Sequence, residues 1–272
     1  MSELTILSLG WGVQSWTLAA MSALNELPKV TAVYADTTWE SEATYQFAAE
    51  WEQWLVDRGV DVVTVKAENT APIRDYHHAT KGHYRGSAIP AFTYNKKSDG
   101  QVRRQCTADW KITPIRRYIT DELTRRNLPK SPSIVEQWLG ISTDEWQRAK
   151  DADVKYIIHR YPLLDLNMSR ADCVMWLQSR GLPVPPKSSC TFCPYHNARA
   201  WQEIKRRGGH DWQEAVEIDL KIRDARPPYP LYVHPARVPL TEAVQIPEDF
   251  GMEQAALFDT NDTACDSGYC FL

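Results

Sequence analysis

The sequence of 272 residues lacks long apolar runs, a strong excess of positive charge and internal repeats. No run approaches the roughly 20 apolar residues that a membrane-spanning helix needs, and the first residues do not resemble a secretory signal. We therefore expect a cytoplasmic protein without a membrane partner. A formal net charge of −4 argues against a general nucleic-acid coat protein, while leaving room for local basic clusters. The length suits one large domain, alone or with a smaller appendage.

Cysteine is present at six positions, which in an intracellular chain favours metal ligands or reactive thiols over disulfides. Cys190 and Cys193 form a CxxC, whose short spacing lets two thiolates hold one metal. The apolar neighbours of Cys173 are typical of a small core residue, which is one interpretation of that cysteine. Spacing alone does not separate an iron–sulfur centre from structural zinc.

The first 67 residues alternate between two kinds of pattern. Short apolar runs at 4–9, 30–37 and 60–67 predict strands, and helical spacing at 13–25 and 41–59 predicts the helices between them. This order predicts a doubly wound α/β fold with a mostly parallel sheet and right-handed crossovers. Ligands of such sheets bind at the carboxyl ends of the strands. We therefore expect residues 8–15 and the pair Asp36 and Thr37 at one crevice.

The rest of the chain is less regular. We expect a long loop over 69–105, followed by a helix at 112–127, a strand within 133–142, a capped helix from Ser169, and two helices at 198–208 and 211–225. The expected division is a nucleotide-binding domain at 1–200 and, at 201–272, a helical extension with a flexible tail that contains cysteines.

The stretch "SLGWGVQS" places a glycine-containing turn between the first strand and the first helix. It contains neither G-K-[ST] nor G-x-G-x-x-G, so it is not a Walker or dinucleotide-binding motif. Amide groups at a helix N-terminus attract anions, and glycine lets the backbone approach them. The turn therefore predicts phosphate binding, with a tight capped turn as the alternative.

The same stretch resembles the pyrophosphate loop of the adenine-nucleotide α-hydrolase-like (PP-loop) superfamily, in the variant of the phosphoadenylyl-sulfate (PAPS) reductases. The positions that fill this pattern are Ser8, Gly10, Trp11, Gly12, Val13, Gln14 and Ser15. Four later segments are similar to segments of that family in the same order: "YADTTWESEATYQF", "RRQCTADWKITPIRR", "GISTDEWQR" and "YPLLDL". The resemblance covers roughly residues 5 to 200, and Thr38 stands where the family has glycine.

The resemblance implies roles for particular residues. The loop would hold the phosphates, with Trp11 packing beneath the nucleotide and Asp36 holding adenosine or a metal ion such as Mg²⁺. The further nucleotide contacts that we expect are Thr37, Arg103, Arg104, Glu145 and Arg148, and Lys111 is expected to be catalytic. Arginine and lysine suit phosphate and sulfate oxygens.

A [4Fe–4S] cluster is also implied, because related sulfonucleotide reductases bind one through a Cys-Cys pair and a later CxxC. Gln105 replaces the first cysteine of that pair here, so the expected ligands are Cys106, Cys190, Cys193 and Cys173. The tail residues Cys265 and Cys270 are candidates for a nucleophile or sulfur carrier. The tail does not reproduce the family motif E-C-G-L-H, and incidental cysteines are the alternative.

These expectations favour an enzyme of adenine-nucleotide-dependent sulfur chemistry. One branch reduces an adenylated sulfate such as PAPS or APS, and the other uses ATP to transfer sulfur to a nucleic acid or a small molecule. The expected partners are the nucleotide, a protein that supplies electrons or sulfur, and a second copy of the chain in a homodimer. The alternative is a non-catalytic nucleotide-binding module with a structural metal.

Overall fold

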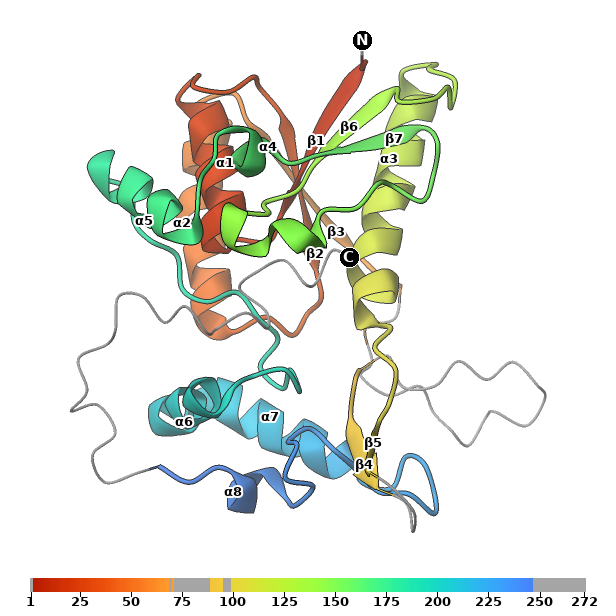
Figure 1. The fold of residues 1–272 in the computed structure, drawn as a ribbon, viewed down its shortest axis with the longest axis vertical. Coiled ribbons are helices and arrows are strands. Elements are labelled where there is room, and N and C mark those ends of the chain that lie inside the picture. The colour runs from red at the N-terminus through yellow and green to blue at the C-terminus, as the bar shows by residue number, and fades with distance from the viewer. Residues whose placement is uncertain (1, 69, 71–88, 95–98, 247–272) are drawn as a thin grey trace.

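A computed structural model describes residues 2–68, 70, 89–94 and 99–246 (Figure 1). Its centre is a five-stranded sheet in the order β3-β2-β1-β6-β7, and all four strand pairings are parallel. The strands are β1 (Leu4–Leu9), β2 (Thr31–Asp36), β3 (Asp61–Lys66), β6 (Val135–Trp138) and β7 (Ile157–Arg160). The expected α/β class is therefore confirmed.

Helices cover both faces of this sheet. One face carries α1 (Val13–Ala23), α2 (Glu42–Val56), α4 (Pro162–Asp165) and α5 (Arg170–Ser179), and the other carries α3 (Thr113–Arg125). Side chains of a strand alternate between faces, so Leu7 and Leu9 pack with α1 and α2 while Leu4 and Ile6 pack with α3. The sheet thus separates two apolar cores, as in a doubly wound fold.

The strand order reverses at β1. Its partner on one side is β2, the next strand in the chain, and its partner on the other side is β6, which follows much later. Gln137 Nε2 donates a hydrogen bond of 2.9 Å to Ser8 Oγ across this pairing. Crevices at the carboxyl ends of strands form at such a reversal, so the loops after β1 and β6 occupy the expected ligand-binding edge.

A second, smaller layer lies beyond the carboxyl ends of the strands (Figure 1). It contains an antiparallel sheet in the order β5-β4-β8 and a separate hydrophobic core that includes Trp110, Phe192 and Trp201. Its elements are β4 (Phe92–Tyr94), β5 (Asp99–Gln101), α6 (Ala198–Arg207), α7 (Gly209–Ile222), β8 (Leu231–Tyr232) and α8 (Leu240–Ala243). Ile89, Ala91, Val102 and Trp110 contribute to this second core although they precede residue 200, and the expected division at that residue stays a prediction.

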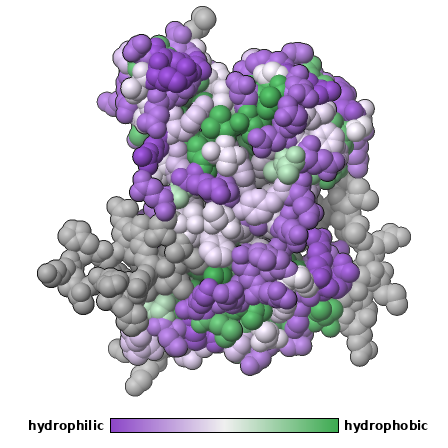
Figure 2. All heavy atoms as spheres, turned by 180° about the vertical axis from the view of Figure 1, so that it is seen from behind, coloured by the Kyte–Doolittle hydropathy of each residue, from purple (hydrophilic) through white to green (hydrophobic). Residues whose placement is uncertain are grey.

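Several local expectations can be compared with the structure. Ser169 caps α5 in a capping box with Asp172, as predicted. Strand β7 and the 3₁₀ helix η3 (Thr143–Arg148) occur where no regular element was expected, and the π-helix η2 (Thr107–Ile112) precedes α3. In the described part of the chain, no helix is long and apolar enough to cross a membrane. Hydrophilic side chains dominate the face in Figure 2, with hydrophobic ones in separate small groups.

Asp219 should be the critical polar residue of the second layer. Its buried carboxylate accepts hydrogen bonds from the amides of Val233 and Leu240, both at 3.0 Å, and from Arg223 at 2.5 Å. Asp219→Ala leaves these donors unsatisfied and should lower the unfolding free energy by about 3–5 kcal/mol. Chemical denaturation measures this change. The control Glu217→Ala, which removes an exposed ion pair of the same helix, should leave stability within experimental error; equal losses in both variants would contradict the assignment.

Candidate functional site

The turn after β1 is anchored by Trp11. Its backbone has φ of 57°, a left-handed conformation that is costly for a bulky residue. The side chain is 0 % exposed, and its ring lies 6.0 Å from Trp16, 6.5 Å from Tyr34 and 6.2 Å from Phe47 between centroids. Burial of the ring offsets the backbone strain and fixes the turn. The expectation that Trp11 packs against a nucleotide is therefore wrong, because the ring lies inside the core.

The first turn of α1 presents backbone amides at this edge. Gly12 is the N-cap in an extended conformation, and its carbonyl accepts the first helical hydrogen bond from Trp16 N at 2.9 Å. Ser15 Oγ accepts a bond of 3.1 Å from Gly10 N and lies 3.3 Å from Gly12 O, which it can bond as a donor. Among the described residues, no side chain caps the helix. The amides of the first turn therefore lack helical partners and are suited to an anion.

Gly140, which follows β6, holds the other side of this edge. A Cβ atom at this position would lie 2.9 Å from Ser15 N and 3.1 Å from the carbonyl carbon of Gln14. A Cβ atom does not lie this close to backbone atoms of another segment. Only glycine at position 140 therefore lets the loop after β6 lie against the first turn of α1. Gln14 is itself buried there. The loops after β1 and β6 are thus in direct contact at the reversal of the sheet.

Glu145 and Arg148 lie in η3, just after this glycine. Their buried side chains form an ion pair of 2.9 Å. The helix is tied to α5, because Asp144 Oδ2 accepts a hydrogen bond of 2.6 Å from Arg170 N. The structure therefore brings both residues to the carboxyl edge of the sheet, where nucleotide contacts were expected; such contacts remain a prediction.

Asp36, at the end of β2, is engaged by its own neighbours. Its carboxylate accepts hydrogen bonds from Thr38 N at 2.7 Å and Tyr45 Oη at 2.8 Å, and it pairs with Lys66 at 2.7 Å. Burial raises the pKa of Asp36, but these bonds outweigh burial and hold the pKa below its usual value. Thr38 has φ of 67°, a left-handed conformation that glycine adopts more readily than a β-branched residue. Asp36 thus shapes the turn after β2.

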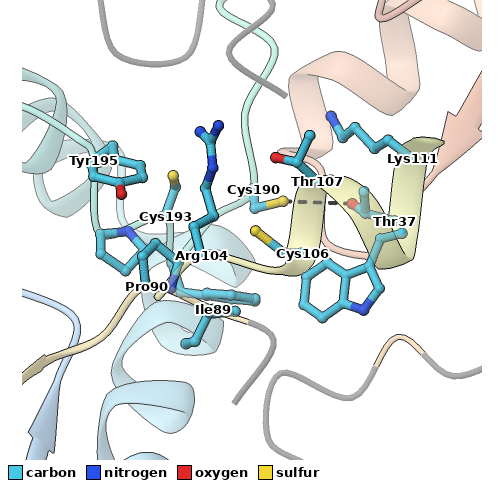
Figure 3. A pocket seen from close by; sticks show the side chains of 13 residues that line it. Thr37, Ile89, Pro90, Arg104, Cys106, Thr107, Lys111, Cys190, Cys193 and Tyr195 are labelled. Carbon is cyan, nitrogen blue, oxygen red and sulfur yellow. Dashed lines mark hydrogen bonds between the residues drawn. The ribbon is translucent and has the colours of Figure 1, made fainter. Parts of the chain in front are cut away.

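A pocket that contains three of the predicted metal ligands lies beside this turn (Figure 3). Cys190 Sγ lies 3.5 Å from Thr37 Oγ1, and the Cys106 thiol points into the same space. The pocket is lined by Thr37, Ile89, Pro90, Arg104, Cys106, Thr107, Trp110, Lys111, Cys190, Phe192, Cys193, Pro194 and Tyr195. The chain segments after β2, before α3 and before α6 thus meet around one apolar cavity with thiols in its wall.

Two cationic side chains accompany the thiols. Lys111 forms a buried ion pair of 3.0 Å with Glu40, and the Arg104 guanidinium lies 5.6 Å from the centroid of the Tyr195 ring. Arg103 is exposed and does not line this pocket. The structure therefore brings Lys111 and Arg104, but not Arg103, to the cysteines.

Cys173 lies elsewhere. It is 0 % exposed in the core between α1 and α5, and burial raises the pKa of its thiol to about 12. This placement contradicts its expected role as a metal ligand and matches the alternative of a small core residue. Cys265 and Cys270 lie outside the described residues, so their expected role stays a prediction.

The remaining thiols can be compared with the requirements of a metal centre. Within the described residues, no three His, Cys, Asp or Glu side chains are grouped closely enough to hold a single ion. Thiolates on one zinc ion stand roughly 3.8 Å apart, as bonds of about 2.3 Å in a tetrahedron require. A [4Fe–4S] cluster binds each thiolate through a different iron, which separates them further. The cysteines that line this pocket offer the sulfur donors that an iron–sulfur cluster or a zinc ion binds, and a metal centre here stays a prediction.

Three residues of the site were not singled out from the sequence. Glu40 binds Lys111, Ser188 Oγ donates a hydrogen bond of 2.5 Å to Gly10 O, and His196 Nε2 lies 2.9 Å from the carbonyl oxygen of Cys190. Ser188 and His196 flank the CxxC, and Glu40 lies within a segment similar to the family. Their nearness to these motifs in the sequence is the signal that could have identified them. The pairings of Glu40 with Lys111 and of Ser188 with Gly10 join residues far apart in the chain, so the sequence alone does not indicate them.

No protein-family model and no curated protein sequence matches this chain. Among solved structures, it is similar to the PAPS reductase from Candida auris in a phosphate complex, with 11% identity, 66% of this chain and 74% of that chain covered, and a TM-score of 0.41. It is also similar to the U34-tRNA thiolase NcsA from Methanococcus maripaludis with its [4Fe-4S] cluster, with 12% identity, coverage of 83% and 67%, and a TM-score of 0.34. The first belongs to the family that the sequence resembles. At this similarity, neither match transfers a ligand or a reaction.

Cys173 should be chemically inert in the folded protein. With a pKa of about 12, roughly one thiol in ten thousand is ionised at pH 8, and the thiolate is the reactive form. Iodoacetamide at pH 8 should therefore leave Cys173 unmodified until urea unfolds the chain, as peptide mass spectrometry can measure. Modification of Cys173 in the folded protein as fast as in urea would contradict its place in the core.

Proposed function

We propose that this protein is an enzyme that binds the phosphates of an adenine nucleotide at the turn after β1 and performs sulfur chemistry at the neighbouring three-cysteine pocket. One observation carries the proposal: Ser188 Oγ, two residues before Cys190, contacts both Gly10 O of the turn and Glu40, the partner of the pocket residue Lys111. These contacts support one connected site at the carboxyl edge of the sheet, formed by the turn after β1 and the thiols.

The nucleotide half rests on the backbone. The amides from Gly12 to Ser15 would bind phosphate oxygens, supported by the positive end of α1. Glu145 and Arg148, on the opposite loop, are proposed to contact the nucleotide. Asp36 acts through the turn that it shapes, and any Mg²⁺ would accompany the polyphosphate.

The cysteine half would hold a [4Fe–4S] cluster on Cys106, Cys190 and Cys193. When bound through three thiolates, such a cluster offers one iron without a protein ligand, at which sulfur can bind. Trp110 and Phe192 in the pocket wall exclude water from this space. Lys111 and Arg104 supply positive charge for an anionic sulfur or sulfate group. The chain's own residues therefore provide a dry, cationic setting for sulfur transfer.

ATP-dependent sulfur transfer is the branch that these residues favour. Gln105 replaces one cysteine of the pair found in cluster-containing reductases, and Cys173 lies in the core, so the described residues offer three thiols to the pocket. The acceptor would be a nucleic acid or a small molecule that ATP activates by adenylation, and a partner protein would supply the sulfur. Reduction of an adenylated sulfate would instead need an electron donor.

Product analysis distinguishes the branches. Anaerobically purified protein, with and without iron reconstitution, is incubated with ATP and candidate acceptors or with PAPS and a reductant. Sulfur transfer predicts pyrophosphate and AMP from ATP, whereas sulfate reduction predicts sulfite from PAPS. Neither product, despite tight nucleotide binding, would support the non-catalytic alternative and overturn the proposed activity.

Gly140→Ala should impair phosphate binding. The added Cβ meets Ser15 N at 2.9 Å, so the first turn of α1 must shift and its amides lose their common direction. Calorimetry with ATP should show at least a tenfold loss of affinity, about 1.4 kcal/mol. Gly100→Ala is the control, because its Cβ meets Thr93 at an ordinary 3.4 Å and should change affinity less than twofold. Full affinity in Gly140→Ala would remove the turn from the binding site.

The cysteine pocket should hold iron. Protein purified without air should be brown and contain about four irons per chain if the cluster is a cubane. Cys190→Ser should lose most of the iron and the visible absorbance, because one of three anchors is gone, whereas Cys173→Ser should keep both. A colourless protein with one zinc per chain would refute the cluster, and loss of iron in Cys173→Ser alone would refute the choice of ligands.

A further inference from the structure

Glu40 and Lys111 form an ion pair in the interior of the site. The Glu40 side chain is 0 % exposed and that of Lys111 is 7 % exposed, with 3.0 Å between Oε1 and Nζ. Removing two charges from water costs several kcal/mol, which their attraction offsets only with good geometry and further hydrogen bonds. A buried ion pair of this kind contributes little net stability to a fold. Its position beside a cysteine pocket therefore indicates a functional role.

The two partners face different parts of the site. Lys111 lines the cysteine pocket, whereas the other carboxylate oxygen of Glu40 lies 3.3 Å from Ser188 Oγ, the hydroxyl that also lies 2.5 Å from Gly10 O. A single hydroxyl therefore separates the carboxylate from the phosphate-binding turn. Carbonyl and carboxylate oxygens are both acceptors, so Gly10 O and the Glu40 carboxylate compete for the single hydroxyl proton of Ser188.

The backbone of Glu40 is held in place as well. It forms an antiparallel bridge with Cys190, and its amide donates a hydrogen bond of 3.3 Å to Tyr45 Oη. Burial and then the charge of Glu40 raise the pKa of Tyr34, so this buried phenol stays neutral beside the pair. The compensating charge for the carboxylate comes from Lys111. Glu40 is thus fixed at the junction of the turn, the CxxC segment and the pocket.

We propose that Glu40 is a positioning residue that holds the Lys111 ammonium at the cysteine pocket and away from the phosphates in the turn. The carboxylate cancels the attraction of Lys111 for a bound polyphosphate and leaves the ammonium for the group that reacts at the pocket. This inference rests on the proposed function, because it assigns Lys111 to the sulfur end of the same site.

Removal of the Glu40 charge should produce two opposite effects. In Glu40→Gln, the amide keeps the shape of the side chain, but the negative charge of the Glu40 carboxylate beside Lys111 is removed. Pyrophosphate, used as the probe, should bind about tenfold more tightly by calorimetry, while turnover of ATP in the product assay should fall at least tenfold. Damage to the structure would lower both pyrophosphate affinity and ATP turnover. Tighter pyrophosphate binding together with slower turnover therefore distinguishes a positioning role from a structural one. Glu40→Asp, which keeps the charge, should restore pyrophosphate affinity to within threefold of the original.

Two further variants keep the test decisive. Glu122→Gln is the matched control, because Glu122 is also largely buried and paired with arginines, but lies on α3 away from the turn; its pyrophosphate affinity should not change. The double variant Glu40→Gln with Lys111→Gln makes the pair neutral, which suits burial, and should bind pyrophosphate within threefold of the original protein. This variant remains informative if Glu40→Gln does not fold.

Unchanged or weaker pyrophosphate binding in folded Glu40→Gln would overturn the inference. A tenfold loss in the double variant would overturn it too, because Lys111 would then bind the phosphates directly. Either result leaves the proposed function intact if the original protein binds ATP. Absence of both ATP and pyrophosphate binding in the original protein would instead reject the proposed function and this inference together.

Discussion

The antiparallel contact between the segment after β2 and the segment around Cys190 places the thiols at the edge of the sheet. Ser41 N donates to Ser189 O, Thr191 N donates to Trp39 O, and Glu40 bridges Cys190. The rings of Trp39 and Phe192 add a contact of 5.2 Å between centroids. Without this contact, the CxxC would belong to the second layer alone. With it, the cysteine pocket lies beside the turn after β1, where Ser188 Oγ donates to Gly10 O.

Strained backbone surrounds this contact. Trp11 and Thr38 both have positive φ, although neither is glycine and Thr38 is β-branched. Each conformation costs on the order of 1–3 kcal/mol and persists only where the surrounding residues hold the backbone in it. For Trp11 the surroundings are the aromatic core, and for Thr38 they are the bonds to Asp36 and Thr70. The π-helix that carries Lys111 is a third irregularity, of a kind frequent at functional sites. Stability elsewhere in the fold thus maintains an unusual local geometry at the turn and the pocket.

The sequence predicted the features that depend on local pattern. The strands β1, β2 and β3, the helices between them and the turn at 10–12 follow from apolar periodicity and glycine placement, and the structure confirms them. Short strands such as β4, β5 and β8 have no such signal, because two or three residues are too few for a period. β4 pairs with β5, which is near it in the chain, and with β8, which is far from it. The same limit applies to the site. Cys106, Cys190 and Cys193 were identified by residue type, whereas the pairing of Glu40 with Lys111 is decided by the fold. Residue type does not reveal which side of a helix or turn faces the core, so the sequence left the core alternative for Cys173 open and did not indicate that the Trp11 ring is buried.

The central claim is that one site joins a nucleotide's phosphates to an iron–sulfur cluster on three cysteines. Anomalous diffraction at the iron edge, from crystals of anaerobically purified protein grown with a non-hydrolysable ATP analogue, tests it directly. We expect iron peaks in the pocket formed by Cys106, Cys190 and Cys193, and phosphate density on the amides from Gly12 to Ser15. Zinc in place of iron, iron bound at Cys173, or a nucleotide away from the carboxyl edge of the sheet would contradict the claim.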